Sequence, residues 1–217
     1  MISLYALTDA RVVLPPGLRA VACESFLAIV ADVEQVPVIT EAALRDHDAT
    51  VRALVTTCEA ILPARFGSVV AAEPELVDAL EARTAALLDA LTLVKGMDQM
   101  TLRVFGAASL VEPIAKPVAA DRSGTDYMIE RQRALQTQTV VDEIARLRPL
   151  LAPLIHGERS ERYAAPPLVG SVYHLVRRGQ ATAYETVVRE AASVMDPIRV
   201  AVSGPWPPYA FAPEAIR

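Results

Sequence analysis

One segment near the end of the chain strongly limits its own conformation. Residues 204–211 combine a glycine, three prolines and three aromatic residues, including the only tryptophan. Proline fixes φ and removes a backbone donor, so this segment cannot continue a helix or occupy a central strand. A stiff, uncharged, aromatic segment must pack: either it docks as a clamp on its own sheet, or Trp206 and Tyr209 anchor a partner. The two interpretations are compatible if the prolines direct one ring inward and one outward.

The composition is that of a globular protein without a nucleic-acid-binding surface. The 217 residues, 53% of them hydrophobic, can form one large or two small domains with a sizeable core. The net charge is −5 and there is no basic tract, which disfavours binding to a phosphate backbone. The N-terminus lacks a signal-peptide pattern and no uncharged run is long enough to cross a bilayer, so we expect a cytosolic protein. Cys23 and Cys58 are then expected as reduced, buried thiols, with a redox pair as the less favoured alternative.

The first half of the chain shows a pattern of strands and helices that is typical of α+β proteins. Alternation and helical periodicity indicate these elements in order: a strand at 2–7, two strands within 19–33 separated by a turn at 23–25, a helix after 40, a strand at 61–70, a helix starting at Pro74, and a strand at 100–105. We expect these elements to form a sheet with helices on one face, in a ferredoxin-like arrangement.

The helix after residue 40 has a clear start signal. The Thr40 hydroxyl can accept a hydrogen bond from an early backbone N–H, and Glu41 places negative charge in the first turn. The residues expected on its buried side recur at helical spacing: Leu44, His47, Val51, Leu54 and Cys58.

The second half is predicted as a separate domain. Residues 107–124 contain prolines and small residues and are typical of a linker between a domain at 1–106 and a domain at 125–217. The second domain is expected to begin with a long helix over 125–151, towards whose end Pro149 lies. The predicted fold class is therefore α+β, with two small domains, at least one of them ferredoxin-like, and a long connecting helix. The remaining predicted elements are a strand at 169–177, a helix at 181–195 and a strand at 198–202.

Residues capable of catalysis or metal binding are few and form no convincing constellation. His47, His156 and His174 have no Cys, His or carboxylate partner at the spacing of metal ligands. The pair His47-Asp48 is similar to the doublet of metal-dependent phosphohydrolases, but too few histidines remain to complete such a site. We therefore favour a His47 at the edge of the core and a solvent-facing Asp48. We expect no enzyme activity, no metal and no cofactor.

Arg65 is the charged residue with the most unusual surroundings, because it lies between Ala64 and Phe66 in a predicted apolar strand. Its stem can pack while its head reaches water, or it can form a structural ion pair. Alternatively, the guanidinium anchors a carboxylate or the C-terminal carbonyl groups of a partner. The sequence leaves these interpretations open.

Six short motifs occur in order over nearly the whole chain. The two most specific are Leu62-Pro63-Ala64-Arg65-Phe66-Gly67-Ser68-Val69 and Gly204-Pro205-Trp206-Pro207-Pro208-Tyr209-Ala210-Phe211. The other four are Leu4-Tyr5-Ala6-Leu7, His47-Asp48 with Val51, Met100-Thr101-Leu102-Arg103-Val104, and Gly124-Thr125-Asp126-Tyr127-Met128 with Glu130-Arg131. Together they resemble the gas vesicle GvpL/GvpF family. The resemblance implies an accessory protein of gas vesicle formation, with a two-domain α+β architecture, that binds the small hydrophobic shell protein and assists its nucleation or assembly.

The resemblance also sets the expected partners and location. The partners would be the shell protein and other gas vesicle accessory proteins, and the location would be the cytoplasm, in association with gas vesicles; self-association is left open. The alternatives are a ferredoxin-like ligand-binding or regulatory module and, less favoured, an enzyme acting on a small molecule. The residues expected to bind the partner, or to support the binding surface, are Arg65, Phe66, Trp206, Pro207, Pro208 and Tyr209.

Overall fold

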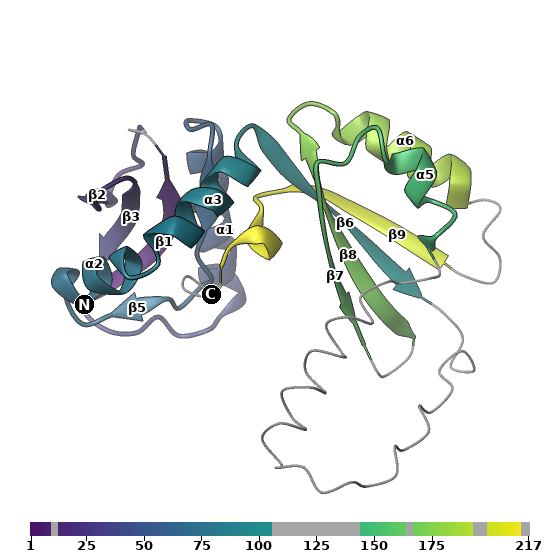
Figure 1. The fold of residues 1–217 in the computed structure, drawn as a ribbon. Helices are drawn as coiled ribbons and strands as arrows, with labels where there is room; N and C mark the ends of the chain where they lie inside the picture. Colours follow the sequence, from purple (N-terminus) through teal and green to yellow (C-terminus); the bar gives the residue numbers. More distant parts are fainter. Residues whose placement is uncertain (10–12, 106–143, 164–166, 193–198, 214–217) are drawn as a thin grey trace, which may run out of the picture. The chain divides into compact units, whose positions relative to one another are not determined.

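The chain forms two compact units in a computed structural model, which describes residues 1–9, 13–105, 144–163, 167–192 and 199–213 (Figure 1). The first unit consists of Met1–Met100, Leu175–Ala181 and Gly204–Arg217, and the second consists of Thr101–His174 and Thr182–Ser203. The strands are β1 (Ile2–Thr8), β2 (Arg19–Ala22), β3 (Leu27–Asp32), β4 (Ile61–Pro63), β5 (Val69–Val70), β6 (Met97–Phe105), β7 (Gly157–Arg162), β8 (Leu168–Arg177) and β9 (Arg199–Trp206). The helices are α1 (Glu41–Val55), α2 (Glu73–Glu81), α3 (Thr84–Val94), α5 (Arg148–Leu151), α6 (Ala181–Ala192) and the 3₁₀ turn η3 (Tyr209–Phe211).

The first sheet contains the apolar N-terminal strand in its interior. The strand order is β2-β3-β1-β4, and β5 also pairs with β1. The pairings of β1 are antiparallel, and Ala6 lies opposite Ile29 of β3 and Pro63 of β4. Ala6 and Leu7, which point to opposite faces, are both fully buried. The predicted strands within residues 1–33 and the turn at 23–25 are confirmed.

Helix α1 begins where the sequence predicts. The Thr40 hydroxyl accepts a hydrogen bond from the backbone N–H of Ala43 at 3.1 Å, which satisfies one donor of the first turn. The prediction for Leu44 is wrong, because 44% of its surface is exposed. Leu44 and Ile39 occupy the two positions of a hydrophobic staple, which acts at the helix entry rather than in the core. The buried side of α1 packs with β1, β3 and β4 in a core cluster: Ala6, Ile29, Val51, Leu54, Cys58 and Ile61.

Two predicted elements are interrupted in the structure. The predicted strand at 61–70 consists of two short strands, β4 and β5, separated by a turn in which Gly67 has a φ of 86°. A strand cannot continue through that left-handed conformation, which glycine adopts at little cost. Arg65 therefore lies in the turn, and its predicted place within an apolar strand is wrong. The predicted helix from Pro74 is divided into α2 and α3, because Arg83 leaves the helical conformation with a φ of −127°.

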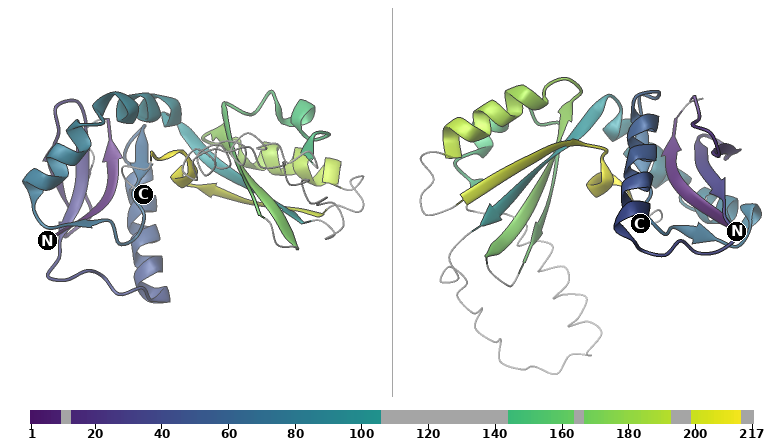
Figure 2. Two further views of the ribbon diagram at one scale, coloured as in Figure 1. Left: turned by 60° about the horizontal axis from the view of Figure 1, so that its bottom comes forward. Right: turned by 180° about the vertical axis from the view of Figure 1, so that it is seen from behind.

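The second sheet has the order β7-β8-β6-β9, and helices α5 and α6 lie on one of its faces (Figures 1 and 2). The strand predicted at 100–105 belongs to β6 and hence to this sheet, so the prediction that it closes the first sheet is wrong. Alternation indicates a strand but does not identify its neighbours. Strand β9 lies at the edge of the sheet, where Pro205 disrupts no central ladder.

The α+β class is confirmed, whereas its finer details are not. A ferredoxin-like motif has a helix between its first two strands, but residues 13–18 form a loop and a turn. Residues 125–143 of the predicted long helix lie outside the described residues, and its last part contains only the short helix α5. Pro149 lies in the first turn of α5, where its missing N–H has no helical partner to lose.

Neither compact unit is a single continuous stretch of the chain. The end of β8, at Leu175–Ala181, and the segment from Gly204 onwards belong to the first unit. The predicted linker at 107–124 lies outside the described residues, and the domain boundaries 1–106 and 125–217 stay a prediction. Among the helices that the structure describes, none is long and apolar enough to span a bilayer.

Candidate functional site

Most of the proline- and aromatic-rich segment docks on the first unit. Pro207 and Pro208 are buried, and the 3₁₀ turn that follows places Phe211 in the core with 1% of its surface exposed. The backbone N–H of Ala210 donates to the side-chain oxygen of Gln99 at 2.8 Å. This part of the segment is therefore a clamp on its own unit. Phe211, its deepest residue, was not among the predicted site residues.

Trp206 differs from the two buried prolines that follow it, because 37% of its surface is exposed. The guanidinium carbon of Arg52 lies 4.7 Å from the centroid of its ring, in a cation–π contact. Arg52 Nε also donates to Asp48 Oδ2 at 2.7 Å, one turn earlier on α1. The tryptophan is thus held on α1 by a paired cation, while more than a third of its surface is open to a partner.

Tyr209, three residues after Trp206, packs against the core of the first unit. It is partly buried against the core cluster that contains Val51 of α1. Burial raises the pKa of its hydroxyl well above the usual value, Asp48 adds to this effect, and Arg52 opposes it. The phenol is therefore neutral at physiological pH and serves as a packing group, as do the two buried prolines before it.

His47 lies at the edge of the core, as the sequence predicts, and forms the centre of an aromatic cluster. Its ring stacks on Tyr5 at a centroid distance of 4.8 Å and meets the edge of Phe66 at 5.7 Å. Its Nε2 lies 3.1 Å from the backbone carbonyl oxygen of Ala64, so Nε2–H donates there. Burial lowers the pKa of His47, which keeps the ring neutral. The cluster connects β1, α1 and the turn that carries Arg65.

The resemblance of His47-Asp48 to a metal-binding doublet has no structural counterpart. The Nε2 atom of His47 is bonded to a backbone carbonyl, and Asp48 is paired with Arg52. Over the residues that the structure describes, no group of three or more His, Cys, Asp or Glu side chains could hold a metal ion. Cys23 and Cys58 are free and buried, and burial raises the pKa of both thiols to about 11.

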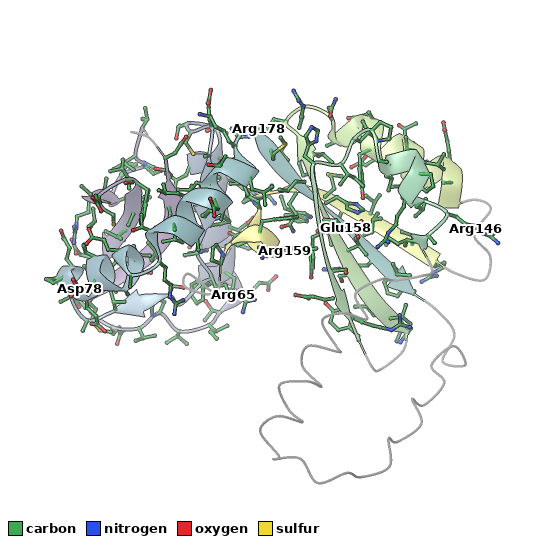
Figure 3. All side chains as sticks on the ribbon, viewed as in Figure 1. Arg65, Asp78, Arg146, Glu158, Arg159 and Arg178 are labelled. Atoms are coloured by element: carbon green, nitrogen blue, oxygen red, sulfur yellow. The ribbon has the colours of Figure 1, made fainter. Side chains whose placement is uncertain are left out.

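Arg65 is exposed in the turn between β4 and β5, at the surface of the first unit (Figure 3). The turn is fixed because the carbonyl oxygen of Arg65 accepts hydrogen bonds from Ser68 N at 3.2 Å and from Ser68 Oγ at 2.8 Å. Its guanidinium has no hydrogen-bond or ion-pair partner within the described parts of the chain, so the structural ion pair is not found there. Phe66, the next residue, is half-buried against His47.

A second polar cluster, in the second unit, was not found by sequence analysis. Glu158, His174 and Tyr184 form a carboxylate–imidazole–hydroxyl series, with distances of 3.0 Å and 2.6 Å. This order is that of a catalytic triad, but the side chains of His174 and Tyr184 are fully buried, so the hydroxyl faces no substrate. The three residues lie on separate elements at irregular spacing, and no local sequence pattern identifies them.

The fold and these sites define a two-unit α+β protein with an aromatic and basic surface on its first unit. The comparison with known families is unambiguous: the chain belongs to the family described as gas vesicle synthesis protein GvpL/GvpF, whose model matches residues 4–213. The expectation from the six motifs is thus confirmed, and the family supports a role in gas vesicle formation, together with other gas vesicle components. The family is not a known class of enzymes.

Two curated relatives and two solved structures agree with this assignment. The chain is 26% identical over 194 residues to gas vesicle protein F2 of Halobacterium salinarum, covering 88% of this chain and 78% of that protein. It is 28% identical over 186 residues to gas vesicle protein L of a Streptomyces species, covering 78% and 68%. The fold is similar to the crystal structure of GvpF from Anabaena, with a TM-score of 0.69 over 98% of this chain and 95% of that chain. It is also similar to the crystal structure of GvpF from Microcystis aeruginosa, with a TM-score of 0.70 over 98% of each chain. Each of these two proteins is 14% identical in sequence to this chain, so the similarity shows a shared fold.

Proposed function

We propose that this protein binds the hydrophobic shell protein of gas vesicles through the first unit and assists its nucleation or assembly, in the cytoplasm. The observation that carries the proposal is that Arg65, Phe66 and Trp206 are all at least partly exposed, and that Phe66 and Trp206 each contact a side chain of α1. These three residues are proposed to form one binding surface. Two of these residues are fixed in place by side-chain contacts, Phe66 by His47 and Trp206 by Arg52. A preorganised aromatic and arginine surface loses little side-chain entropy on binding.

The charge at this surface favours a partner with an acidic group beside apolar residues. Arg52 is already paired with Asp48, whereas Arg65 has no partner among the described residues. An unpaired guanidinium next to a half-buried aromatic ring can bind a carboxylate or the carbonyl groups of a helix end. Pro207, Pro208 and Tyr209 are proposed as the support of Trp206 rather than as contact residues.

We propose that exposed apolar residues just before and at the start of α1 extend the surface. Leu44 lies one turn before His47 on α1, and His47 contacts Phe66. A group of exposed apolar side chains close together in the chain is typical of an interaction surface. The exposed fractions are 55% for Val36, 72% for Val38, 77% for Ile39 and 44% for Leu44.

The test is the binding of purified shell protein to Arg65→Ala and Trp206→Ala variants of the full chain. Each substitution is expected to weaken binding by about tenfold or more, because each removes an anchor without changing the core. Arg45→Ala is the matched control, since Arg45 is an exposed arginine of α1 that is already paired with Glu41. Folded Arg65 and Trp206 variants that bind as tightly as the unmodified chain would overturn the assignment of this surface. A strain that lacks this protein and still forms normal vesicles would overturn the role itself.

A further inference from the structure

The buried residue His174 connects four elements of the second unit. The ring belongs to β8; its Nε2 lies 3.0 Å from Glu158 Oε2 on β7, and its Nδ1 lies 2.6 Å from the hydroxyl of Tyr184 on α6. Glu158 Oε1, on the sheet of the second unit (Figure 3), accepts a hydrogen bond from Arg148 Nη2 of α5 at 2.8 Å. A single imidazole and its carboxylate partner thus attach both helices to the sheet.

These contacts require one protonation state of the ring. A carboxylate only accepts hydrogen bonds, so Nε2 of His174 carries the proton and donates to Glu158. Nδ1 is then the acceptor, and the hydroxyl of Tyr184 donates to it. The two ring nitrogens and the phenol proton are all satisfied together only in the neutral imidazole.

A second proton on the ring would disrupt the bond to Tyr184. Nδ1–H would become a donor, the phenol would have to accept, and its own proton would lose its partner in a side chain with no exposed surface. Burial lowers the pKa of His174, Glu158 opposes this effect, and Arg148 adds to it. Among the residues that the structure describes, Glu158, Arg148 and Tyr184 are the charged and titratable groups that act on the ring from β7, α5 and α6.

We propose that His174 is a pH-sensitive latch, which holds α6 on the second sheet while it is neutral and releases it when it is protonated. The inference goes beyond the proposed function, because it involves neither the Arg65 surface nor the shell protein. It assigns to the second unit a conformational response to mild acid that is built into its packing.

The sign of the pH dependence follows from the direction of the shift. Because the pKa in the folded unit lies below the ordinary value of 6.5, the unfolded or released form binds the additional proton first. The stabilisation is fully present above 6.5 and is lost as the pH falls below it. The equilibrium constant for release rises by up to about tenfold per pH unit over this range.

The experiment uses the full chain and two measurements. Nitrogen chemical shifts of the imidazole are expected to show the Nε2–H form of His174 at about pH 7.5 and a titration midpoint below its ordinary value. Hydrogen exchange at about pH 7.5 and about pH 5.5, corrected for the intrinsic pH dependence, is expected to show a selective loss of protection in α6, whereas α5 stays attached through Arg148 and Glu158. Exchange in β3 of the first unit, which contains no histidine, serves as the internal reference.

Two conservative variants give shifts of opposite sign, which a purely structural role would not produce. Tyr184→Phe keeps the ring packing but removes the donor to Nδ1, so the midpoint of His174 moves to higher pH. Glu158→Gln removes the charge that stabilises the imidazolium, so the midpoint moves to lower pH. His47→Gln, a change at the other buried histidine described above, is expected to leave the titration midpoint of His174 unchanged. Shifts of the same sign, or protection of α6 that is unaffected while His174 titrates, would overturn the latch.

Discussion

At the scale of single residues, Gly204 is fixed by close contact with β6. Its φ is 137°, and a Cβ atom there would lie 2.8 Å from the backbone oxygen of Gln99 and 2.8 Å from the sulfur of Met100. Backbone strain and overpacking each cost roughly 1–3 kcal/mol, so Gly204→Ala is expected to lower the free energy of unfolding by roughly 2–4 kcal/mol. Urea denaturation of the full chain measures this change.

The control for this prediction is Gly179→Ala. Gly179 also has a positive φ, 86°, but nothing lies within 4 Å of the position of a new Cβ. Only the conformational cost of about 1–2 kcal/mol applies there. If both substitutions cost the same, the contact with Gln99 and Met100 does not determine the residue at 204.

Individual residues were predictable where their local surroundings determine their position. His47 follows helical spacing to the edge of the core, and the prolines of the C-terminal segment require an edge strand, which β9 provides. Arg65 was placed wrongly, because a run of apolar neighbours outweighed the turn that Gly67 allows. His174 was missed, because the groups that bind it are distant in sequence and meet only through the order of the second sheet.

At the scale of elements, the start of α1 depends on one side chain. Thr40→Ala removes the acceptor of the Ala43 N–H and is expected to lower the free energy of unfolding by about 1 kcal/mol. Thr40→Ser keeps a hydroxyl at the same position and should cause no loss of stability, because serine is at least as good an N-cap residue as threonine. Thermal unfolding of the two variants checks the prediction, and equal losses would show that the hydroxyl is not the source of the effect.

Elements were easier to predict than their arrangement. Periodicity located β1, α1 and β8 correctly, because burial of one side of a helix or strand is a local property of the sequence. It did not show that β6 joins the second sheet, since the register and the partners of a strand depend on contacts with distant segments. The division between α2 and α3 was also missed, because no proline or glycine marks residues 82–83.

At the scale of the whole molecule, the first unit contains residues from both ends of the chain. Phe211 is 1% exposed, so Phe211→Ala is expected to lower the free energy of unfolding by about 3–5 kcal/mol. Trp206→Ala removes a 37% exposed ring and a cation–π contact, and should cost about 1 kcal/mol. Hydrogen exchange in α1 is the readout, and a Phe211 variant with unchanged α1 protection would contradict this account.

The participation of residues 204–213 in the first unit has a consequence for biosynthesis. While the ribosome translates the middle of the message, the nascent N-terminal half lacks Phe211 and the peptide N–H that bonds to Gln99. That half therefore reaches its final packing only after nearly all of the chain has been synthesised. Premature termination shortly before codon 204 would leave an exposed core surface for chaperones and proteases to recognise, even though every residue of the first hundred had been made.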